Sequence, residues 1–277
     1  MGGLRIRNIL HPSDLTEESS RALAHACYLA KRFGARVTLY HAAETPDHAQ
    51  PHWAFAHGHE VWCRAEREAR HALEQEATTL GIPCDVIVER VASPPRALLA
   101  LIRERQPDLT VMATHSRRGV RHMVLGSVTE QIFRHAFQPV LCVREPEHRA
   151  PLPYSRILVP TDMSLASRLS FPFAALLARS FGARVIALHA LGAGSAAASI
   201  PSEAALRRFV APDFEDVELE ARVGEGPPWE RIVQAARDEQ VDLIVMSTRG
   251  HDSLSDVILG SNTDRVVRQA PCPVLVA

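Results

Sequence analysis

The sequence predicts an α/β fold in which a domain with a parallel sheet occurs twice. Three observations lead to this prediction: the chain repeats itself, strand-like and helix-like segments alternate within each repeat, and the strands are short and continuously apolar. Short apolar strands separated by helices are typical of a parallel sheet covered on both faces. A chain of 277 residues is also long enough for two domains of ordinary size.

The repeat is visible as matching segments at two constant offsets. Asn8–Asp14 (NILHPSD) returns as Arg156–Asp162 (RILVPTD), so the first offset is 162 − 14 = 148 residues. Segments nearer the end of each repeat return after 134 residues, as in Gly126-Ser127 and Gly260-Ser261. The second repeat is therefore 148 − 134 = 14 residues shorter. The proline-bearing segment 145–153 separates a first domain at 1–146 from a second at 153–277.

Each element of the first repeat follows from its periodicity. Apolar residues at helical spacing predict a helix from about Leu15 to Phe33, and Gly34 follows where a C-terminal cap belongs. Short apolar runs predict the strands, and longer amphipathic runs predict the remaining helices. The predicted strands are 5–10, 37–40, 84–91, 109–113 and 139–143. The other predicted helices are 60–80, 95–105 and 125–136.

Composition narrows the class of protein. The 31 basic and 32 acidic residues give a formal charge of −1, which predicts neither nucleic acid nor an anionic membrane as a partner. No apolar stretch approaches the roughly 20 residues that span a bilayer, and Met1–Leu10 lacks the apolar core of a signal peptide. Five scattered cysteines without a C-x-x-C spacing favour a reducing compartment. We therefore expect a cytoplasmic protein.

Ligands of open α/β sheets bind beyond the carboxyl ends of the strands, so the residues there are the candidate site. A Gly-Ser pair opens a predicted helix in each repeat, where backbone N–H groups favour an anion. The candidates in the first repeat are Ser13, Asp14, His41, Ala113, Ser116, Gly126, Ser127 and Val128. Those in the second repeat are Thr161, Asp162, His189, Ser247, Gly250, Gly260, Ser261 and Asn262.

The sequence of a strand-end aspartate, a G-x-x-G element, nine residues and Gly-Ser resembles the universal stress protein family. Nucleotide-binding members of that family carry G-x-x-G-x9-G-[S/T], and the resemblance covers essentially the whole chain, twice. It implies five parallel strands in the order 3-2-1-4-5, a Rossmann-like, adenine nucleotide alpha hydrolase-like fold. The resemblance further implies that the ligand is ATP or AMP, with or without Mg²⁺. It also implies that Asp14 and Asp162 lie beside the adenine or ribose.

Departures from the family pattern rank the two repeats. Ala113 and Ser116 replace both early glycines of the first repeat, whereas in the second repeat only Ser247 replaces a glycine. Since a lost glycine narrows access of the backbone to phosphate, the second repeat is predicted to be the better nucleotide site. Arg117 and Arg118 could compensate by pairing with phosphate, or could be solvated loop charges.

Several candidates have structural alternatives. Asp14 could brace the start of a helix, and His41 and His189 could be histidines at the edge of the core. His48, His52, His57 and His59 are close enough in sequence for a metal site, although Pro46 and Pro51 argue against one regular helix there. Gly192–Ala197 imitates a dinucleotide fingerprint but follows the second strand rather than the first, which favours a plain loop.

Catalysis is not supported by a recognisable constellation. Lys31 is the sole lysine of the chain, so no Walker A Gly-Lys pair exists, and neither G-x-S-x-G nor H-E-x-x-H occurs. We expect a stress-response regulatory protein that binds ATP or AMP. The alternatives are an interaction module without nucleotide and, third, a slow ATPase or autophosphorylating protein.

The last strand of each repeat is short and apolar, and in the family fold it lies at a sheet edge. Uncovered strand edges tend to pair. We therefore expect Val140–Val143 and Val274–Val276 to pair within one chain about a pseudo-twofold axis. Alternatively, the same strand edges could pair between two chains and form a homodimer.

Overall fold

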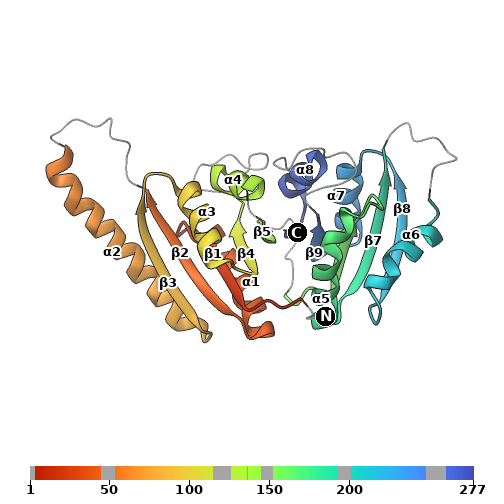
Figure 1. The fold of residues 1–277 in the computed structure, drawn as a ribbon, viewed down its shortest axis with the longest axis horizontal. Helices are drawn as coiled ribbons and strands as arrows, with labels where there is room; N and C mark the ends of the chain where they lie inside the picture. Colours follow the sequence, from red (N-terminus) through yellow and green to blue (C-terminus); the bar gives the residue numbers. More distant parts are fainter. Residues whose placement is uncertain are drawn as a thin grey trace. The chain divides into compact units, whose positions relative to one another are not determined.

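The computed structural model describes residues 4–44, 54–114, 126–135, 137–144, 152–192, 201–247 and 260–277, with backbone only for 54–62 (Figure 1). These residues form two compact units. One is built on the described residues from Arg5 to Gln138, and the other on those from Pro139 to Ala277. The last strand of the first repeat thus belongs to the same unit as the second repeat.

The first unit is a parallel sheet with helices on both faces. The strands stand in the order β3-β2-β1-β4. Helices α1 and α2 cover one face, and α3 and α4 the other (Figure 1). The elements are β1 (Asn8–Pro12), α1 (Glu17–Phe33), β2 (Arg36–Glu44), α2 (Ala54–Leu80), β3 (Cys84–Val91), α3 (Pro94–Arg105), β4 (Leu109–Ala113) and α4 (Ser127–His135).

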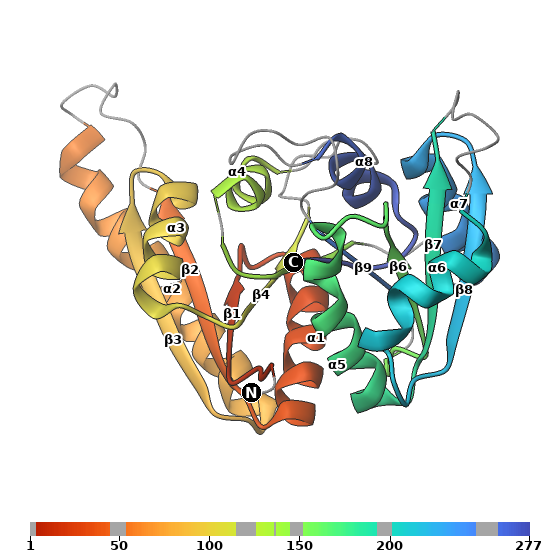
Figure 2. The same ribbon diagram turned by 45° about the vertical axis from the view of Figure 1, so that its right-hand side comes forward.

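The second unit has the strand order β5-β10-β9-β6-β7-β8. Its strands β6 to β10 are parallel, and α5 and α6 cover one face while α7 and α8 cover the other (Figure 2). The strands are β5 (Val140–Val143), β6 (Arg156–Pro160), β7 (Arg184–Leu191), β8 (Leu219–Glu225), β9 (Leu243–Met246) and β10 (Val274–Val276). The helices are η1 (Ser167–Ser170), α5 (Phe171–Phe181), α6 (Glu203–Val210), η3 (Ala211–Asp213), α7 (Pro228–Asp238) and α8 (Ser261–Gln269).

The predicted α/β class is confirmed. The second repeat shows the order 3-2-1-4-5 in full, as β8-β7-β6-β9-β10, and the first unit shows its first four strands. Strand β2 extends to Glu44, beyond the predicted end at Tyr40, because it stays paired with β3 up to Val91. Helix α2 begins at Ala54, six residues before its predicted start.

Repeated capping devices set the ends of the first helix in each repeat. Gly34 adopts the left-handed conformation (φ 66°), and its N–H donates to Ala30. Gly182 does the same at the end of α5 (φ 65°), with Ala178 as acceptor. Since this conformation costs residues with a Cβ atom, the Phe-Gly-Ala-Arg-Val segment of both repeats predicts the end of a helix and the return into a strand.

An aspartate fixes the beginning of the central strand in both repeats. Asp108 Oδ2 accepts from the backbone N–H groups of Arg7 (2.8 Å) and Asn8 (2.9 Å). Asp242 Oδ2 accepts in the same way from Ser155 (2.8 Å) and Arg156 (2.9 Å). A carboxylate that takes two backbone donors satisfies groups that the sheet leaves unpaired.

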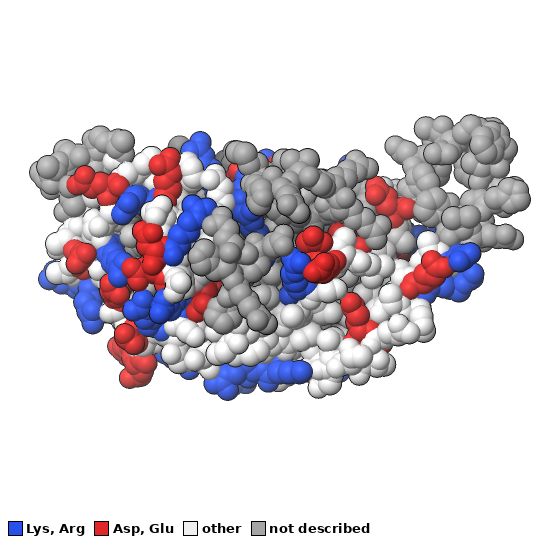
Figure 3. Space-filling model, turned by 180° about the vertical axis from the view of Figure 1, so that it is seen from behind, with Lys and Arg blue, Asp and Glu red and all other residues white. Residues whose placement is uncertain are grey.

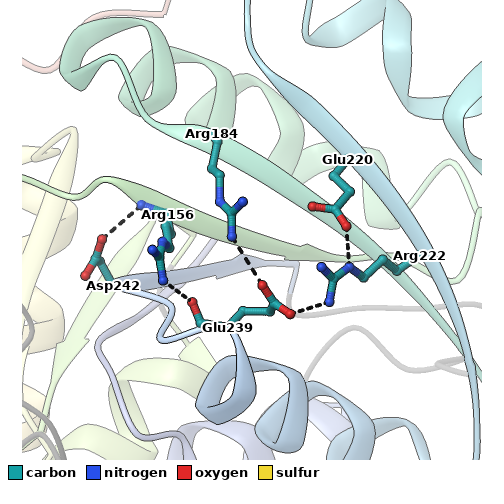
Figure 4. A network of polar contacts seen from close by, with 6 residues as sticks. All are labelled: Arg156, Arg184, Glu220, Arg222, Glu239 and Asp242. Atoms are coloured by element: carbon teal, nitrogen blue, oxygen red, sulfur yellow. Dashed lines mark hydrogen bonds and ion pairs between the residues drawn. The ribbon is translucent and has the colours of Figure 1, made fainter.

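In the second repeat, a network of charged side chains centred on Glu239 lies near the beginning of β6 (Figure 4). Its carboxylate contacts Arg184 (3.2 Å) and Arg222 (2.5 Å), and Arg156 donates to its backbone carbonyl (2.8 Å). The hydrogen bond from Arg222 is the main reason that the pKa of Glu239 lies below its usual value. Cations near the last carbonyls of α7 also suit the helix dipole. The network therefore ties the C-terminal end of α7 to β6, β7 and β8.

Charges of both signs are mixed on the described surface seen in Figure 3. Several form pairs one helical turn apart, such as Arg21–Glu17 and Arg134–Glu130, and each such exposed pair contributes little to stability. Within the described residues, none of the helices combines the length and apolar character needed to cross a bilayer.

The last strands of the two repeats pair with each other, as expected. β5 and β10 are antiparallel, and Leu141 stands opposite Leu275, its counterpart in the repeat. The register is therefore symmetric about this pair, and both side chains are buried. Arg144, one residue beyond β5, donates to the carbonyls of Val267 (3.3 Å) and Arg268 at the end of α8.

We expect Leu141→Lys or Leu275→Lys to lower the free energy of unfolding by about 3 kcal/mol or more, because each places an unpaired charge in the buried centre of this strand pair. Urea denaturation followed by circular dichroism measures the loss. The matched control is Leu169→Lys, since Leu169 is 62% exposed. Equal midpoints for Leu275→Lys and the control would show that the pairing does not stabilise the fold.

Candidate functional site

The register of the first sheet brings the candidate residues to one edge. Pro12 at the end of β1 pairs with Tyr40 of β2, and the N–H of Ser13 donates to the Tyr40 carbonyl (2.8 Å). His41 Nδ1 then lies 2.8 Å from the carbonyl oxygen of Ser13. Because a carbonyl only accepts, Nδ1 is the donor, and Nε2 of the neutral ring remains an acceptor. His41 is thus both a brace between strand ends and a potential ligand group.

A pocket of about 610 Å³ lies at this edge. All seven described candidates of the first repeat line it: Ser13, Asp14, His41, Ala113, Gly126, Ser127 and Val128. Ser116, Arg117 and Arg118 lie outside the described residues. The seven candidates therefore come together from three strand ends and one helix start.

Helix α4 begins at the wall of this pocket. Gly126 N–H donates to the carbonyl of Thr114 (3.0 Å), and Thr129 Oγ1 donates to that of Ala113 (3.3 Å). Both bonds tie the first turn of α4 to the end of β4. The first intrahelical bond of this turn is Glu130 N–H to Gly126 (3.0 Å), so earlier N–H groups are left for other acceptors. Such a helix start favours an anionic group.

Asp14 has a structural role beside its place in the pocket. Its Oδ1 accepts from both the N–H (3.1 Å) and the hydroxyl of Thr16. Thr16, rather than Asp14, is the N-cap of α1, accepting from Ser19 N–H. Leu15, between them, has φ 61°, and Met163 has the same value at the equivalent position. Left-handed backbone at a residue other than glycine stores strain, and such strain clusters at functional sites.

A buried histidine stands behind the pocket, and the sequence reading missed it. His11 Nδ1 bonds the carbonyl of Val111 (2.8 Å), and Nε2 lies 3.3 Å from Ser19 Oγ, which is 3.2 Å from Ser13 Oγ. Burial lowers the pKa of His11 to about 4, although the bond to Val111 acts in the opposite direction. A histidine inside an otherwise apolar strand is the signal that could have found it.

Twelve other pocket residues were also missed. Eight belong to the second strand or follow the third: Tyr40, Ala42, Glu44, Ala92, Ser93, Pro94, Pro95 and Leu98. The other four lie on β1, α1, β4 and α4: Pro12, Ser19, Met112 and Thr129. The third strand ends at the same edge as the first and second, so the loop after β3 was open to the same inference.

The second repeat reproduces the bracing at its strand ends. Thr161 N–H donates to Leu188 (2.9 Å), His189 Nδ1 bonds the carbonyl of Thr161 (2.8 Å), and Thr263 Oγ1 bonds that of Ser247 (3.1 Å). Asp162 accepts from the N–H of Ser164 (3.0 Å) and is exposed. Gly260, Ser261 and Asn262 stand at the start of α8. Gly250 lies outside the described residues.

The suggested metal site also falls largely outside the described chain. His48 and His52 are not described, and His57 and His59 lie in the part of α2 where only the backbone is described. Among the side chains that the structure does describe, no group of three His, Cys, Asp or Glu residues could hold a metal ion.

A model of the universal stress protein family matches residues 5–144 and, a second time, residues 153–277. The chain belongs to this family. A universal stress protein of Mycolicibacterium smegmatis is 26% identical over 292 residues, which cover 97% of this chain and 96% of the relative. This chain is therefore similar over its full length to another protein of the same family.

One solved structure has the same fold over nearly the whole chain. The structure of a universal stress protein from Archaeoglobus fulgidus has a TM-score of 0.73 and 20% identity, covering 98% of this chain and 97% of that one. A family protein from Arabidopsis thaliana was solved with AMP bound; it has a TM-score of 0.37 and 13% identity, and covers 53% of this chain and 97% of its own.

The low pKa of His11 predicts how the stability of this universal stress protein depends on pH. Well above pH 6.5 the ring is neutral in both the folded and unfolded states, so it adds no pH dependence there. As the pH falls from about 6.5 towards 4, the His11 ring is protonated in the unfolded state but stays largely neutral in the folded state. The free energy of unfolding therefore falls by about 3 kcal/mol.

We expect His11→Val, which copies Val159 of the second repeat, to remove that part of the pH dependence. It should also cost about 1–2 kcal/mol at pH 8, because Ser19 and the Val111 carbonyl lose a partner. Urea denaturation between pH 8 and pH 4.5 measures both effects, with the exposed His71→Val as control. An unchanged slope in His11→Val would contradict the assignment; His25, whose pKa burial also lowers to about 4, contributes equally in all variants.

Proposed function

We propose that this universal stress protein binds adenine nucleotide, ATP or AMP, and acts as a stress-response regulatory protein rather than as an enzyme. The observation that carries the proposal is the first-repeat pocket, which gathers seven candidate residues from three strand ends and the start of α4. Its volume of about 610 Å³ is in the usual range for small-molecule sites.

The lining of the pocket suits the two ends of a nucleotide. Leu98, Met112 and the prolines of α3 supply apolar surface for a base. With Nδ1 as the donor to Ser13, Nε2 of the neutral His41 ring is an acceptor, which fits the exocyclic amino group of adenine better than the carbonyl oxygen of guanine. The start of α4 at Gly126 and Ser127 supplies N–H groups for phosphate.

The charges of the lining residues affect how many phosphate groups of a nucleotide the pocket can bind. Among the described lining residues the ionisable side chains with fixed charge are the carboxylates Asp14 and Glu44. Phosphates would therefore depend on backbone N–H groups, on Arg117 and Arg118, or on a Mg²⁺ ion that takes carboxylate oxygens as ligands. AMP carries less charge and needs less of this compensation than ATP.

The second repeat also remains a candidate nucleotide site, because its glycines match the nucleotide-binding motif. Gly250, Gly260 and Ser261 match the nucleotide-binding motif more fully than their counterparts, and this ranking stays a prediction. The proposed residues there are Thr161, Asp162, His189, Ser247, Gly250, Gly260, Ser261 and Asn262. None of the five cysteines, all of which lie within the described residues, forms a disulfide, which suits a reducing compartment such as the cytoplasm.

A second candidate function is an interaction module that binds no nucleotide. The observation that favours it is the loss of motif glycines at Ala113, Ser116 and Ser247. Slow ATP hydrolysis or autophosphorylation at Ser127 or Ser261 is a third reading, for which the sequence supplies no general base.

Nucleotide released from the freshly purified, denatured protein should be identified by mass spectrometry, beside calorimetric titration of ATP and AMP. We expect adenine nucleotide to be bound, and Gly126→Glu to weaken binding in the first repeat at least tenfold, because a carboxylate would face the phosphates. Gly260→Glu tests the second repeat in the same way. The control is Thr79→Glu, on an exposed part of α2. Absence of bound and titratable nucleotide would favour the interaction module.

A further inference from the structure

The two repeats differ at one wall of the site. Helix α3 begins with Pro94 and Pro95, which both line the first-repeat pocket. Helix α7 begins with Pro228 and Trp229, and 229 − 95 = 134 is the offset of the repeat. An indole ring therefore stands in the second repeat where the first has a proline ring.

Trp229 lies on the face of α7 that is turned to the protein. Ile232, Val233 and Ala236 are the buried residues of this helix, and Trp229 precedes them by three, four and seven positions, so it shares their face. In the first repeat Leu98, the counterpart of Ile232, lines the pocket. The position of Trp229 on the helix thus corresponds to the wall of the pocket and not to the outer surface.

The indole ring, carried by α7, contacts a side chain of α8. Arg265 of α8 places its guanidinium carbon 5.3 Å from the centre of the indole ring. The indole Nε1 is shielded from solvent and has no hydrogen-bond partner among the residues that the structure describes. A buried donor without a partner is unfavourable, so the apolar contacts of the ring and its contact with Arg265 must outweigh that loss. Helices α7 and α8 are the counterparts of α3 and α4, whose first turns line the first-repeat pocket.

Two strand-end side chains of the second repeat are also less exposed than their counterparts. His189 is 8% exposed and Ser247 7% exposed, whereas their counterparts His41 and Ala113 are half-buried. These two positions are thus less accessible to solvent in the second repeat, whereas Asp162 is exposed and its counterpart Asp14 is half-buried.

We infer that Trp229 fills the second repeat's counterpart of the pocket, so that the chain binds one nucleotide, in its first repeat. This inference rests on the proposed function. It opposes the prediction, made from the glycines, that the second repeat is the better nucleotide site. The glycines decide how closely the backbone can approach phosphate, whereas Trp229 decides whether the base and ribose can enter. Trp229 is then the residue that decides which repeat binds.

The number of nucleotides bound per chain tests this inference. Equilibrium dialysis with ATP and with AMP should give one per chain for the wild type and none for Gly126→Glu. Trp229→Pro copies the Pro-Pro start of α3, where proline is tolerated, and should raise the number to two. The double variant Gly126→Glu/Trp229→Pro should bind one.

Two further variants keep the test decisive. Trp229→Ala opens the same space without altering the backbone, in case Trp229→Pro does not fold, and Glu230→Ala is the control on the neighbouring residue of α7. Two nucleotides on the wild type, or one on folded Trp229→Pro and Trp229→Ala, overturn this inference and leave the proposed function standing. No nucleotide on any variant overturns both.

Discussion

The register of the parallel strands is the constraint on which the candidate site depends. β1 is the central strand of its sheet, paired with β2 on one side and β4 on the other. Asp108 fixes its beginning through two backbone N–H groups, and the bond from Ser13 to Tyr40 fixes its end. A shift of one residue would turn each side chain to the other face of the sheet. Ser13, His41 and Ala113 meet only because this register holds.

Much of this arrangement could be predicted because it depends on the backbone. The strand at 109–113 and the helix ends at Gly34 and Gly182 follow from apolar runs and from the one residue type that suits the left-handed conformation. The gathering of the seven first-repeat candidates follows from strand direction alone, since parallel strands end at the same edge of a sheet.

The rest depends on side-chain contacts that periodicity does not report. His11 reads as a polar interruption of an apolar strand, and only the structure shows that the carbonyl of Val111 and the hydroxyl of Ser19 satisfy its ring. The sequence likewise shows that Trp229 replaces Pro95. It does not show that the ring lies against Arg265, or that its N–H has no partner among the described residues, because both depend on the packing of α7 against α8.

The symmetric pairing of β5 with β10 has a consequence for how the two halves can evolve. In a dimer of two identical chains every substitution occurs in both partners, so the two sites stay alike. Here the paired strands belong to one polypeptide, and dilution cannot separate them as it separates subunits. In a fused chain, a substitution can therefore occur in one half alone. A difference such as Pro95 against Trp229 can then persist while the shared pair of strands is kept.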